Sequence, residues 1–151
     1  MRKNAVKVTI TGVRETVEKL RAYPRSVQQK GKELIQETAL IVASGAKKRC
    51  PVNKLKGVGG SLRASIRPTY YNNGLTADIG TDIEYGPFVE FGTGVRGQLT
   101  SSLFISRGEL VLPEGYKHGP SPGTSAQPFL YPSMVEAQPD YVRKMRKIVE
   151  P

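Results

Sequence analysis

Apolar and polar residues alternate over residues 5–11, AVKVTIT, near the start of the chain. A period of two is typical of a strand that buries one face and exposes the other, so this stretch predicts a half-buried strand. Gly12 ends the pattern. A short helix should follow and stop at Tyr23-Pro24, because the residue before a proline is disfavoured in the α region.

A helical period governs residues 25–48 and predicts the longest helix of the chain. Apolar and small residues recur there at spacings of three and four, which gives a wide apolar face of the kind that lies across a sheet. The face combines two rows: Val27, Gly31, Leu34, Thr38, Ile41 and Gly45, and beside them Ile35, Ala39, Val42 and Ala46. Small residues at 43–46 allow another backbone to approach closely, and Cys50-Pro51 should end the helix.

Two extended runs, 66–72 and 75–81, are separated by a turn that contains Asn73-Gly74. Both residue types tolerate positive φ, which makes this the strongest hairpin signal in the chain. Apolar residues alternate with polar or small ones in the second run, so one of its faces should be buried. Just before the hairpin, Ser61 is expected to cap a short helical turn.

The stretch 83–94, IEYGPFVEFGTG, follows the hairpin and combines aromatic, glycine and acidic residues. Tyr85, Phe88 and Val89 are spaced so that a single helical turn would place them on one side, and Pro87 fits the start of such a turn. The glycines at 92 and 94 should end the turn.

Glu90 is the chemically active residue type in this stretch. It could act as a general base, but no second acid, histidine or metal-binding set lies nearby in the sequence. The alternative is a structural role, in which Glu90 pairs with a basic residue or caps backbone amides, and we favour it. The stretch therefore predicts a structural junction rather than an active site.

Residues 95–127 carry several prolines and glycines, so no continuous element is expected there beyond a short strand at 110–112. A long loop inside a folded domain is usually functional or mobile, and we interpret 95–126 as a loop that orders on assembly with partners. The last helix should have Pro132 in its first turn, and Pro139 should kink or divide it. Its apolar side comprises Met134, Tyr141, Met145 and Ile148.

The net charge of +10 is distributed unevenly, since residues 1–67 hold 16 Lys/Arg and 4 Asp/Glu, a net of +12. An asymmetric basic face favours contact with a polyanion or an acidic protein surface, and a solvated face is the alternative. No Gly-Lys-Ser/Thr follows the glycines of 47–67, so this segment lacks the spacing of a phosphate-binding loop. The candidate polyanion contacts are Lys47, Lys48, Arg49, Lys54, Lys56, Arg63 and Arg67.

With 151 residues, 38% of them hydrophobic, the chain is expected to form one domain over 1–151, with a flexible basic loop at 53–60 and the assembly loop at 95–126. The single cysteine, Cys50, has no partner for an internal disulfide, and one histidine argues against a metal site. No apolar run approaches the roughly 20 residues of a membrane span, and no signal-peptide pattern follows Met1. Neither enzyme activity nor a cofactor is predicted.

Taken in order, these segments resemble the tail-completion, or head–tail joining, proteins of long-tailed bacteriophages and prophages. The resemblance rests on AKKRCP at 46–51, GSLRASI at 60–66, the hairpin, YGPFVEFGT at 85–93 and QPFLYP at 127–132. It covers nearly the whole chain except 95–126. It departs from the family at 59–62, where the chain reads GGSL and the family usually has Thr-Gly-x-Leu.

The resemblance implies an α+β fold, a small antiparallel β-sheet packed against a long α-helix, with a C-terminal helix and long flexible loops. It implies a homo-oligomeric ring, with a hexamer among the allowed sizes, in the virion neck. That ring would assemble in the host cytoplasm and contact head-connector and tail proteins, with the basic first half of the chain facing either the packaged DNA or acidic partner rings. It implies no catalysis, no cofactor and no small-molecule substrate. The junction residues that it assigns are Tyr85, Phe88, Val89, Glu90, Phe91, Gly92, Thr93, Pro128 and Phe129.

A structural protein of the phage neck is thus the leading hypothesis, and a basic nucleic-acid-binding module is the alternative. Binding to duplex DNA across salt concentrations separates the two. Seven phosphate contacts predict a log–log slope of about −6.

Overall fold

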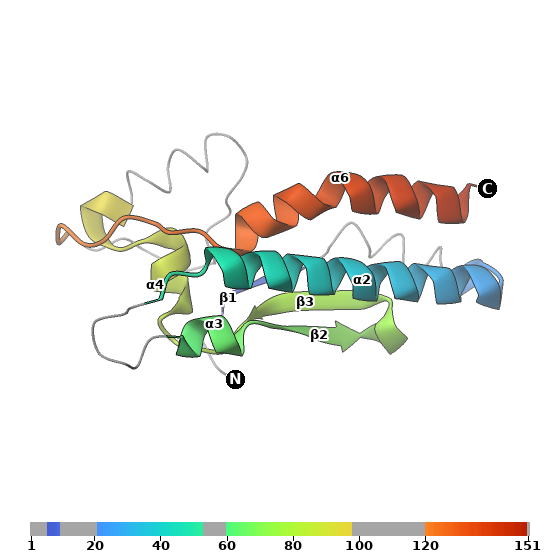
Figure 1. Cartoon of the computed structure of the whole chain (residues 1–151), viewed down its shortest axis with the longest axis horizontal. Coiled ribbons are helices and arrows are strands. Elements are labelled where there is room, and N and C mark those ends of the chain that lie inside the picture. The colour runs from blue at the N-terminus through green and yellow to red at the C-terminus, as the bar shows by residue number, and fades with distance from the viewer. Residues whose placement is uncertain (1–5, 10–20, 53–59, 98–119, 151) are drawn as a thin grey trace.

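The computed structural model describes residues 6–9, as backbone, and residues 21–52, 60–97 and 120–150. Three layers follow one another: a three-stranded sheet, the long helix α2 (Arg25–Arg49) and the C-terminal helix α6 (Leu130–Val149) (Figure 1). The short helices α3 (Ser61–Ser65) and α4 (Gly86–Phe91) lie near the C-terminal end of α2. The fold is therefore α+β, as predicted.

α2 begins and ends where the sequence predicts, to within one residue. Pro24 precedes its first residue, and the Cys50 amide donates to the Ala46 carbonyl at 2.8 Å to close its last turn before Pro51. Basic residues at 47–49 lie at the negative end of the helix dipole, where they are favoured. The buried positions of α2 are Gly31, Leu34, Ile35, Thr38, Ala39, Val42, Ala43 and Ala46.

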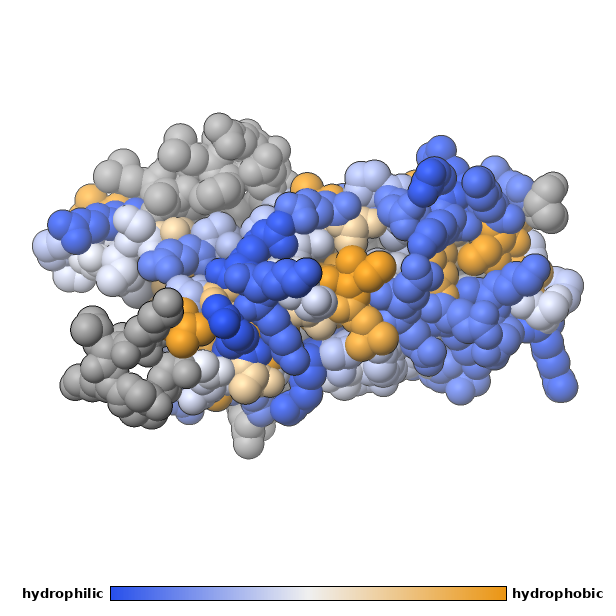
Figure 2. Space-filling model, in the orientation of Figure 1, coloured by the Kyte–Doolittle hydropathy of each residue, from blue (hydrophilic) through white to orange (hydrophobic). Residues whose placement is uncertain are grey.

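The prediction that Ile41 is buried with the rest of the apolar face is wrong, because its side chain is 50% exposed. Leu40 beside it is 59% exposed, and both line a groove between α2 and α6. Figure 1 shows that α6 bends along its length, and Figure 2 shows an apolar patch over the middle of α2. Since α6 does not close over this part of α2, a residue on the apolar stripe is left in solvent.

The predicted hairpin is confirmed as β2 (Arg67–Tyr71) and β3 (Thr76–Thr81), joined by a turn at Asn72–Gly74. All three turn residues have positive φ, at 52°, 56° and 84°, which Asn and Gly tolerate better than other residues. The strand near the start of the chain, β1 (Val6–Thr9), pairs antiparallel with the other side of β3. The sheet order is therefore β1-β3-β2.

The two faces of the sheet differ in polarity. Leu75, Ala77 and Ile79 are at most 3% exposed and belong to the core that α2 covers. The intervening positions of β3, Thr76, Asp78 and Gly80, are partly exposed on the second face. One face thus supports the core, and the opposite face carries polar or small residues.

One further prediction is wrong: Ser61 does not cap α3, since it lies inside the helix and Gly60, with φ of 127°, occupies the cap position. Of the two effects expected from Pro139, the structure shows a bend in α6 and no division, because the helix continues through the proline (Figure 1). The predicted short helix before Pro24 lies mostly at 10–20, and the strand at 110–112 also lies outside the described residues.

Candidate assembly junction

Glu90 is a buried carboxylate that caps a helix 39 residues further along the chain. It lies on α4 with 1% of its surface exposed. One carboxylate oxygen accepts hydrogen bonds from the amides of Phe129 and Leu130 at 2.8 and 3.0 Å, and the other accepts from Tyr131 at 3.0 Å. Phe129 occupies the cap position of α6 and has no side-chain acceptor, so Glu90 supplies the missing cap.

The electrostatics of Glu90 combine two opposed effects. Burial raises the pKa of its carboxyl above the ordinary value, and the three backbone donors lower the pKa again without cancelling that increase. A negative charge at a helix N-terminus is also favoured by the helix dipole. Of the two structural roles considered from the sequence, the structure shows amide capping.

A paired stem follows α4. Thr93 and Thr124 exchange backbone hydrogen bonds at 2.8 and 3.1 Å, and the Val95 amide donates to the Ser121 carbonyl at 2.9 Å. We call residues 92–97 and 120–126 the stem. It holds together the two ends of 98–119, a segment outside the described residues, and residues 94–97 within it are helical.

Three glycines with positive φ make the stem pairing possible. A Cβ added at Gly123 would lie 1.9 Å from the Thr93 carbonyl oxygen, and one at Gly94 would lie 2.1 Å from that of Ser121. Gly92 ends α4, and a Cβ there would lie 2.6 Å from the backbone of Thr124. The two arms of the stem are therefore too close together for any side chain at these positions.

The aromatic residues assigned to the junction separate into two groups. Phe91 and Phe129 are 4% and 0% exposed and belong to the core, whereas Tyr85 and Phe88 are 48% and 46% exposed. Val89 is partly buried against the core. The exposed members give the start of α4 an aromatic outer surface.

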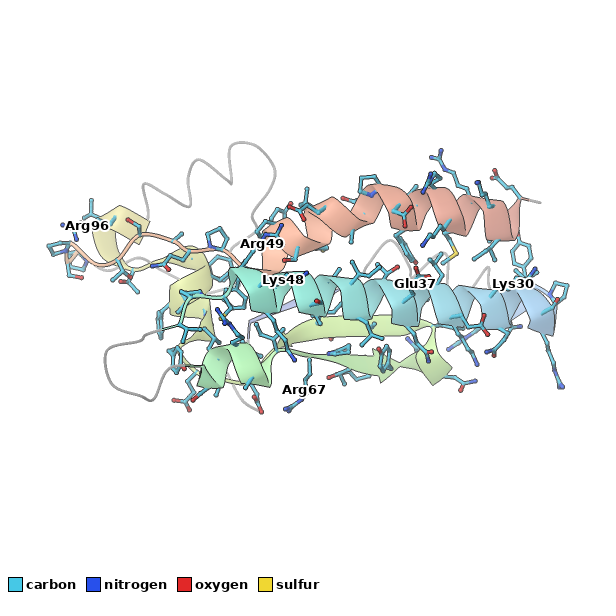
Figure 3. All side chains as sticks on the ribbon, in the orientation of Figure 1. Lys30, Glu37, Lys48, Arg49, Arg67 and Arg96 are labelled. Carbon is cyan, nitrogen blue, oxygen red and sulfur yellow. The ribbon has the colours of Figure 1, made fainter. Side chains whose placement is uncertain are left out.

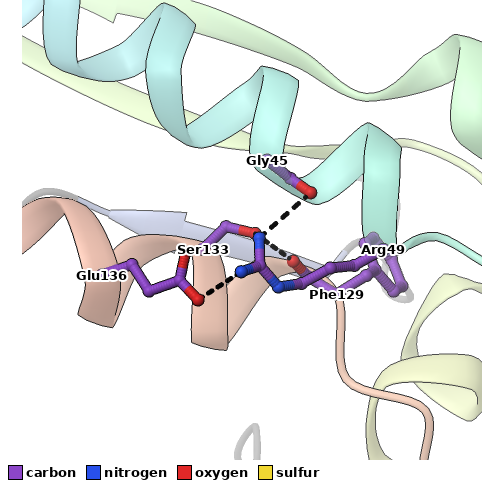
Figure 4. Close-up of polar contacts among 5 residues, drawn as sticks. All are labelled: Gly45, Arg49, Phe129, Ser133 and Glu136. Carbon is purple, nitrogen blue, oxygen red and sulfur yellow. Dashed lines mark hydrogen bonds and ion pairs between the residues drawn. The ribbon is translucent and has the colours of Figure 1, made fainter.

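Arg49 joins the two long helices (Figure 4). It donates to the Ser133 hydroxyl at 3.1 Å and the Gly45 carbonyl at 3.3 Å, and it pairs with Glu136. Ser133 in turn donates to the Phe129 carbonyl at 2.7 Å. A Cβ at Gly45 would lie 3.2 Å from the Ser133 hydroxyl, so a small residue there allows the close approach predicted for 43–46.

Of the described candidate polyanion contacts, Arg63 and the basic residues at 47–49 lie at the C-terminal end of α2, and Arg67 lies apart from them on β2. Figure 3 shows Lys48 and Arg49 at one end of α2 and Arg67 on the sheet side of that helix. Arg63 donates to the Cys50 carbonyl at 2.8 Å, and Arg67 pairs with Asp82 at 3.3 Å. Lys54 and Lys56 lie outside the described residues. Among the described members, Lys47 and Lys48 are exposed with no acidic partner in the described part of the chain.

Sequence reasoning missed the partners of Arg49. Gly45 and Arg49 are four residues apart on one helix, and Ser133 and Glu136 are three apart on another. Such spacings place each pair on one helix face. This is the only signal in the sequence for the contact, because no local pattern predicts that the two helix faces pack against each other.

Replacing Arg49 with lysine should lower the free energy of unfolding by about 1 kcal/mol. Lysine keeps the charge but cannot reach Ser133, Gly45 and Glu136 at once, because it lacks the guanidinium fork. Chemical denaturation measures the change, and Lys47→Met, on the same helix and exposed, is the control with an expected effect within about 0.5 kcal/mol. Equal losses in the two variants would contradict the bridging role of Arg49.

Within the described residues, no group of three or more His, Cys, Asp or Glu side chains is placed to hold a metal ion. Burial raises the pKa of the lone thiol, Cys50, which keeps it protonated and unreactive. None of the helices that the structure describes is long and apolar enough to cross a membrane.

Comparison with protein families gives a match over the first part of the chain. The family model described as "Bacteriophage HK97-gp10, putative tail-component" matches residues 14–92, slightly more than half of the chain. The matched region covers α2, the hairpin and α4 and ends within the stem. Comparisons with curated proteins and with solved structures gave no match.

Proposed function

The chain belongs to the bacteriophage HK97-gp10-like tail-component family, and from this premise we propose that it forms a ring in the virion neck that joins the head connector to the tail. Family membership makes it a tail component and therefore a protein that meets other virion proteins. The neck position, the ring and the joining role are the proposal. The role is structural, and no step of it requires catalysis.

The stem is the observation that supports this role best. The layered body has its own core, yet the chain leaves that body after α4, pairs with itself over 92–97 and 120–126, and returns to start α6 (Figure 1). Backbone pairing fixes where the intervening segment leaves and re-enters the stem. A backbone-paired stem outside the layered body is expected of a subunit that contacts its neighbours.

Electron microscopy of purified particles tests the proposal. We expect one closed ring of this chain between the head connector and the tail. Particles produced without the chain should accumulate as filled heads and separate tails. A position repeated along the length of the tail, or absence of the chain from the virion, would contradict the proposal.

Contact with packaged DNA is the second candidate role, favoured by the exposed Lys47 and Lys48 at the end of α2. Each phosphate contact contributes about −0.9 to the log–log dependence of affinity on salt concentration. The double substitution Lys47→Ala with Lys48→Ala should therefore reduce the magnitude of the slope by about 2. Titration of duplex DNA at several salt concentrations measures it, and an unchanged slope would exclude these two lysines from the contact.

A further inference from the structure

A groove with an apolar floor separates part of α6 from α2. Its volume is about 710 Å³, and Leu40, Ile41 and Ala137 provide its apolar surface. Lys48 and Arg49 also line it. Two adjacent large apolar residues that are at least half exposed on a helix packed between the sheet and α6 are unusual for a surface that only meets water, and they mark it as a contact surface.

The shape of α6 explains why the groove is open. α6 is tied to α2 at two places, through Arg49 and Ser133 near its start and through Lys144 and Glu37, 2.7 Å apart, further along. Pro139 lies between these two ties, and α6 bends along this length (Figure 1). A proline removes a hydrogen bond from the helix interior and displaces the backbone, which accounts for the bend. Ile41 lines the groove beside this bent helix and stays 50% exposed.

The same chain carries a surface complementary to this groove. Tyr85 and Phe88, at the start of α4, are each nearly half exposed, and Glu84 precedes them. In the described part of the chain, the side chains of Glu84 and Glu150 make no hydrogen bond or ion pair, whereas those of the other acidic residues do. We call residues 84–88 the aromatic edge.

The two surfaces are complementary in charge as well as in apolar character. The groove has an apolar floor and the exposed cation of Lys48, whereas the aromatic edge has two rings and the exposed anion of Glu84. Within one chain Lys48 and Glu84 do not pair. Figure 1 places α4 beyond the C-terminal end of α2. The groove is lined by residues of α2 and α6, so the two surfaces occupy different parts of the molecule.

We propose that the groove of one copy receives the aromatic edge of the next copy, with Lys48 facing Glu84 across the contact. Because the two surfaces differ, each copy offers one to each neighbour, and repetition of this head-to-tail contact closes into a ring when the rotation between copies allows it. This inference rests on the proposed ring and identifies the surfaces that would build it.

Charge reversal at the two positions tests the contact. Lys48→Glu and Glu84→Lys should each weaken self-association at low salt by about tenfold or more, because each places like charges together. The chain with both substitutions should regain association, and so should a mixture of the two single variants, in which unlike subunits alternate around rings of even number. Native mass spectrometry and sedimentation over a concentration series measure this, with Lys47→Glu and Glu150→Lys as matched controls that should assemble normally.

The apolar part of the contact has its own variant. Ile41→Ser should weaken association without lowering the stability of the monomer, because Ile41 is already half exposed; Val135→Ser, on α6 and outside the groove, is the control. The proposal is overturned by single charge reversals that assemble like the unaltered chain, by a double variant that stays dissociated, or by a chain that remains monomeric at every concentration. These outcomes leave the neck assignment standing, because that assignment depends on where the chain lies in particles.

Discussion

Replacing Glu90 with glutamine should lower the free energy of unfolding by about 2–4 kcal/mol at neutral pH. Three backbone amides at the start of α6 donate to the carboxylate, and two of them share one oxygen. Glutamine has the same shape but only one acceptor oxygen, and the NH2 group that replaces the other oxygen would face a backbone N–H donor. Since Glu90 is 1% exposed, no water can take over the lost acceptor.

The pH dependence of this loss follows from the direction of the pKa shift. Burial raises the pKa of Glu90 in the folded state, so the folded chain binds this proton more tightly than the unfolded chain. The stability that this carboxyl contributes is then fully present below its unfolded pKa of about 4.3 and declines as pH rises through the folded value. The difference between the unaltered chain and Glu90→Gln should therefore shrink from pH 4 towards neutrality.

Denaturant unfolding of both chains across this pH range measures the difference, in which the titration of all other groups cancels. Glu84→Gln is the matched control, because Glu84 is an exposed acid six residues earlier and should change stability by less than about 0.5 kcal/mol at any pH. A Glu90→Gln chain as stable as the unaltered one would show that the cap of α6 does not depend on this side chain.

The sequence specifies those parts of the fold whose causes are local. Pro24 and Pro51 define the ends of α2, and the Asn-Asn-Gly turn defines the hairpin, because each restricts its own backbone or that of its neighbour. The helical turn of α4 follows in the same way from Pro87 and Gly92. These elements need no knowledge of the rest of the chain, and they are predicted correctly.

The junction depends on contacts between distant residues. Glu90 meets amides that are 39–41 positions away, and Thr93 meets Thr124 across 31 positions. When a side chain caps a different helix, the number of residues between the two is not fixed, so no sequence pattern identifies the pair. The sequence therefore leaves two structural roles open for Glu90, and only the fold distinguishes between them. The predicted burial of Ile41 is wrong for a related reason: the exposure of Ile41 depends on how α6 packs against α2, which the sequence around Ile41 does not determine.

Replacing Gly123 with alanine should open the stem, because among the glycines that the structure describes an added Cβ would make its shortest contact there. The backbone at Gly123 has φ of 62°, and the added Cβ would lie 1.9 Å from the Thr93 carbonyl oxygen and 2.3 Å from its carbon. Backbone atoms on the opposite arm cannot rotate out of the way as a flexible side chain can. The two arms must therefore separate, and their hydrogen bonds are lost.

Hydrogen exchange measures this opening directly at the amides of Thr93, Val95, Arg96 and Thr124, all of which donate across the stem. Their protection should fall about a hundredfold or more, equivalent to about 3 kcal/mol of local stability, while the amides of α2 stay protected. Gly60→Ala is the matched control: its φ is also positive, at 127°, but in the described part of the chain no atom beyond its own neighbours in sequence lies within 4 Å of its added Cβ. Gly60→Ala therefore tests backbone strain alone, with an expected cost of about 1–2 kcal/mol.

If the stem amides of Gly123→Ala kept their protection, the stem would not depend on the close approach of its two arms. If they lost it and rings still formed, the stem would not be needed for assembly, and the contact between the groove and the aromatic edge would have to hold the ring by itself.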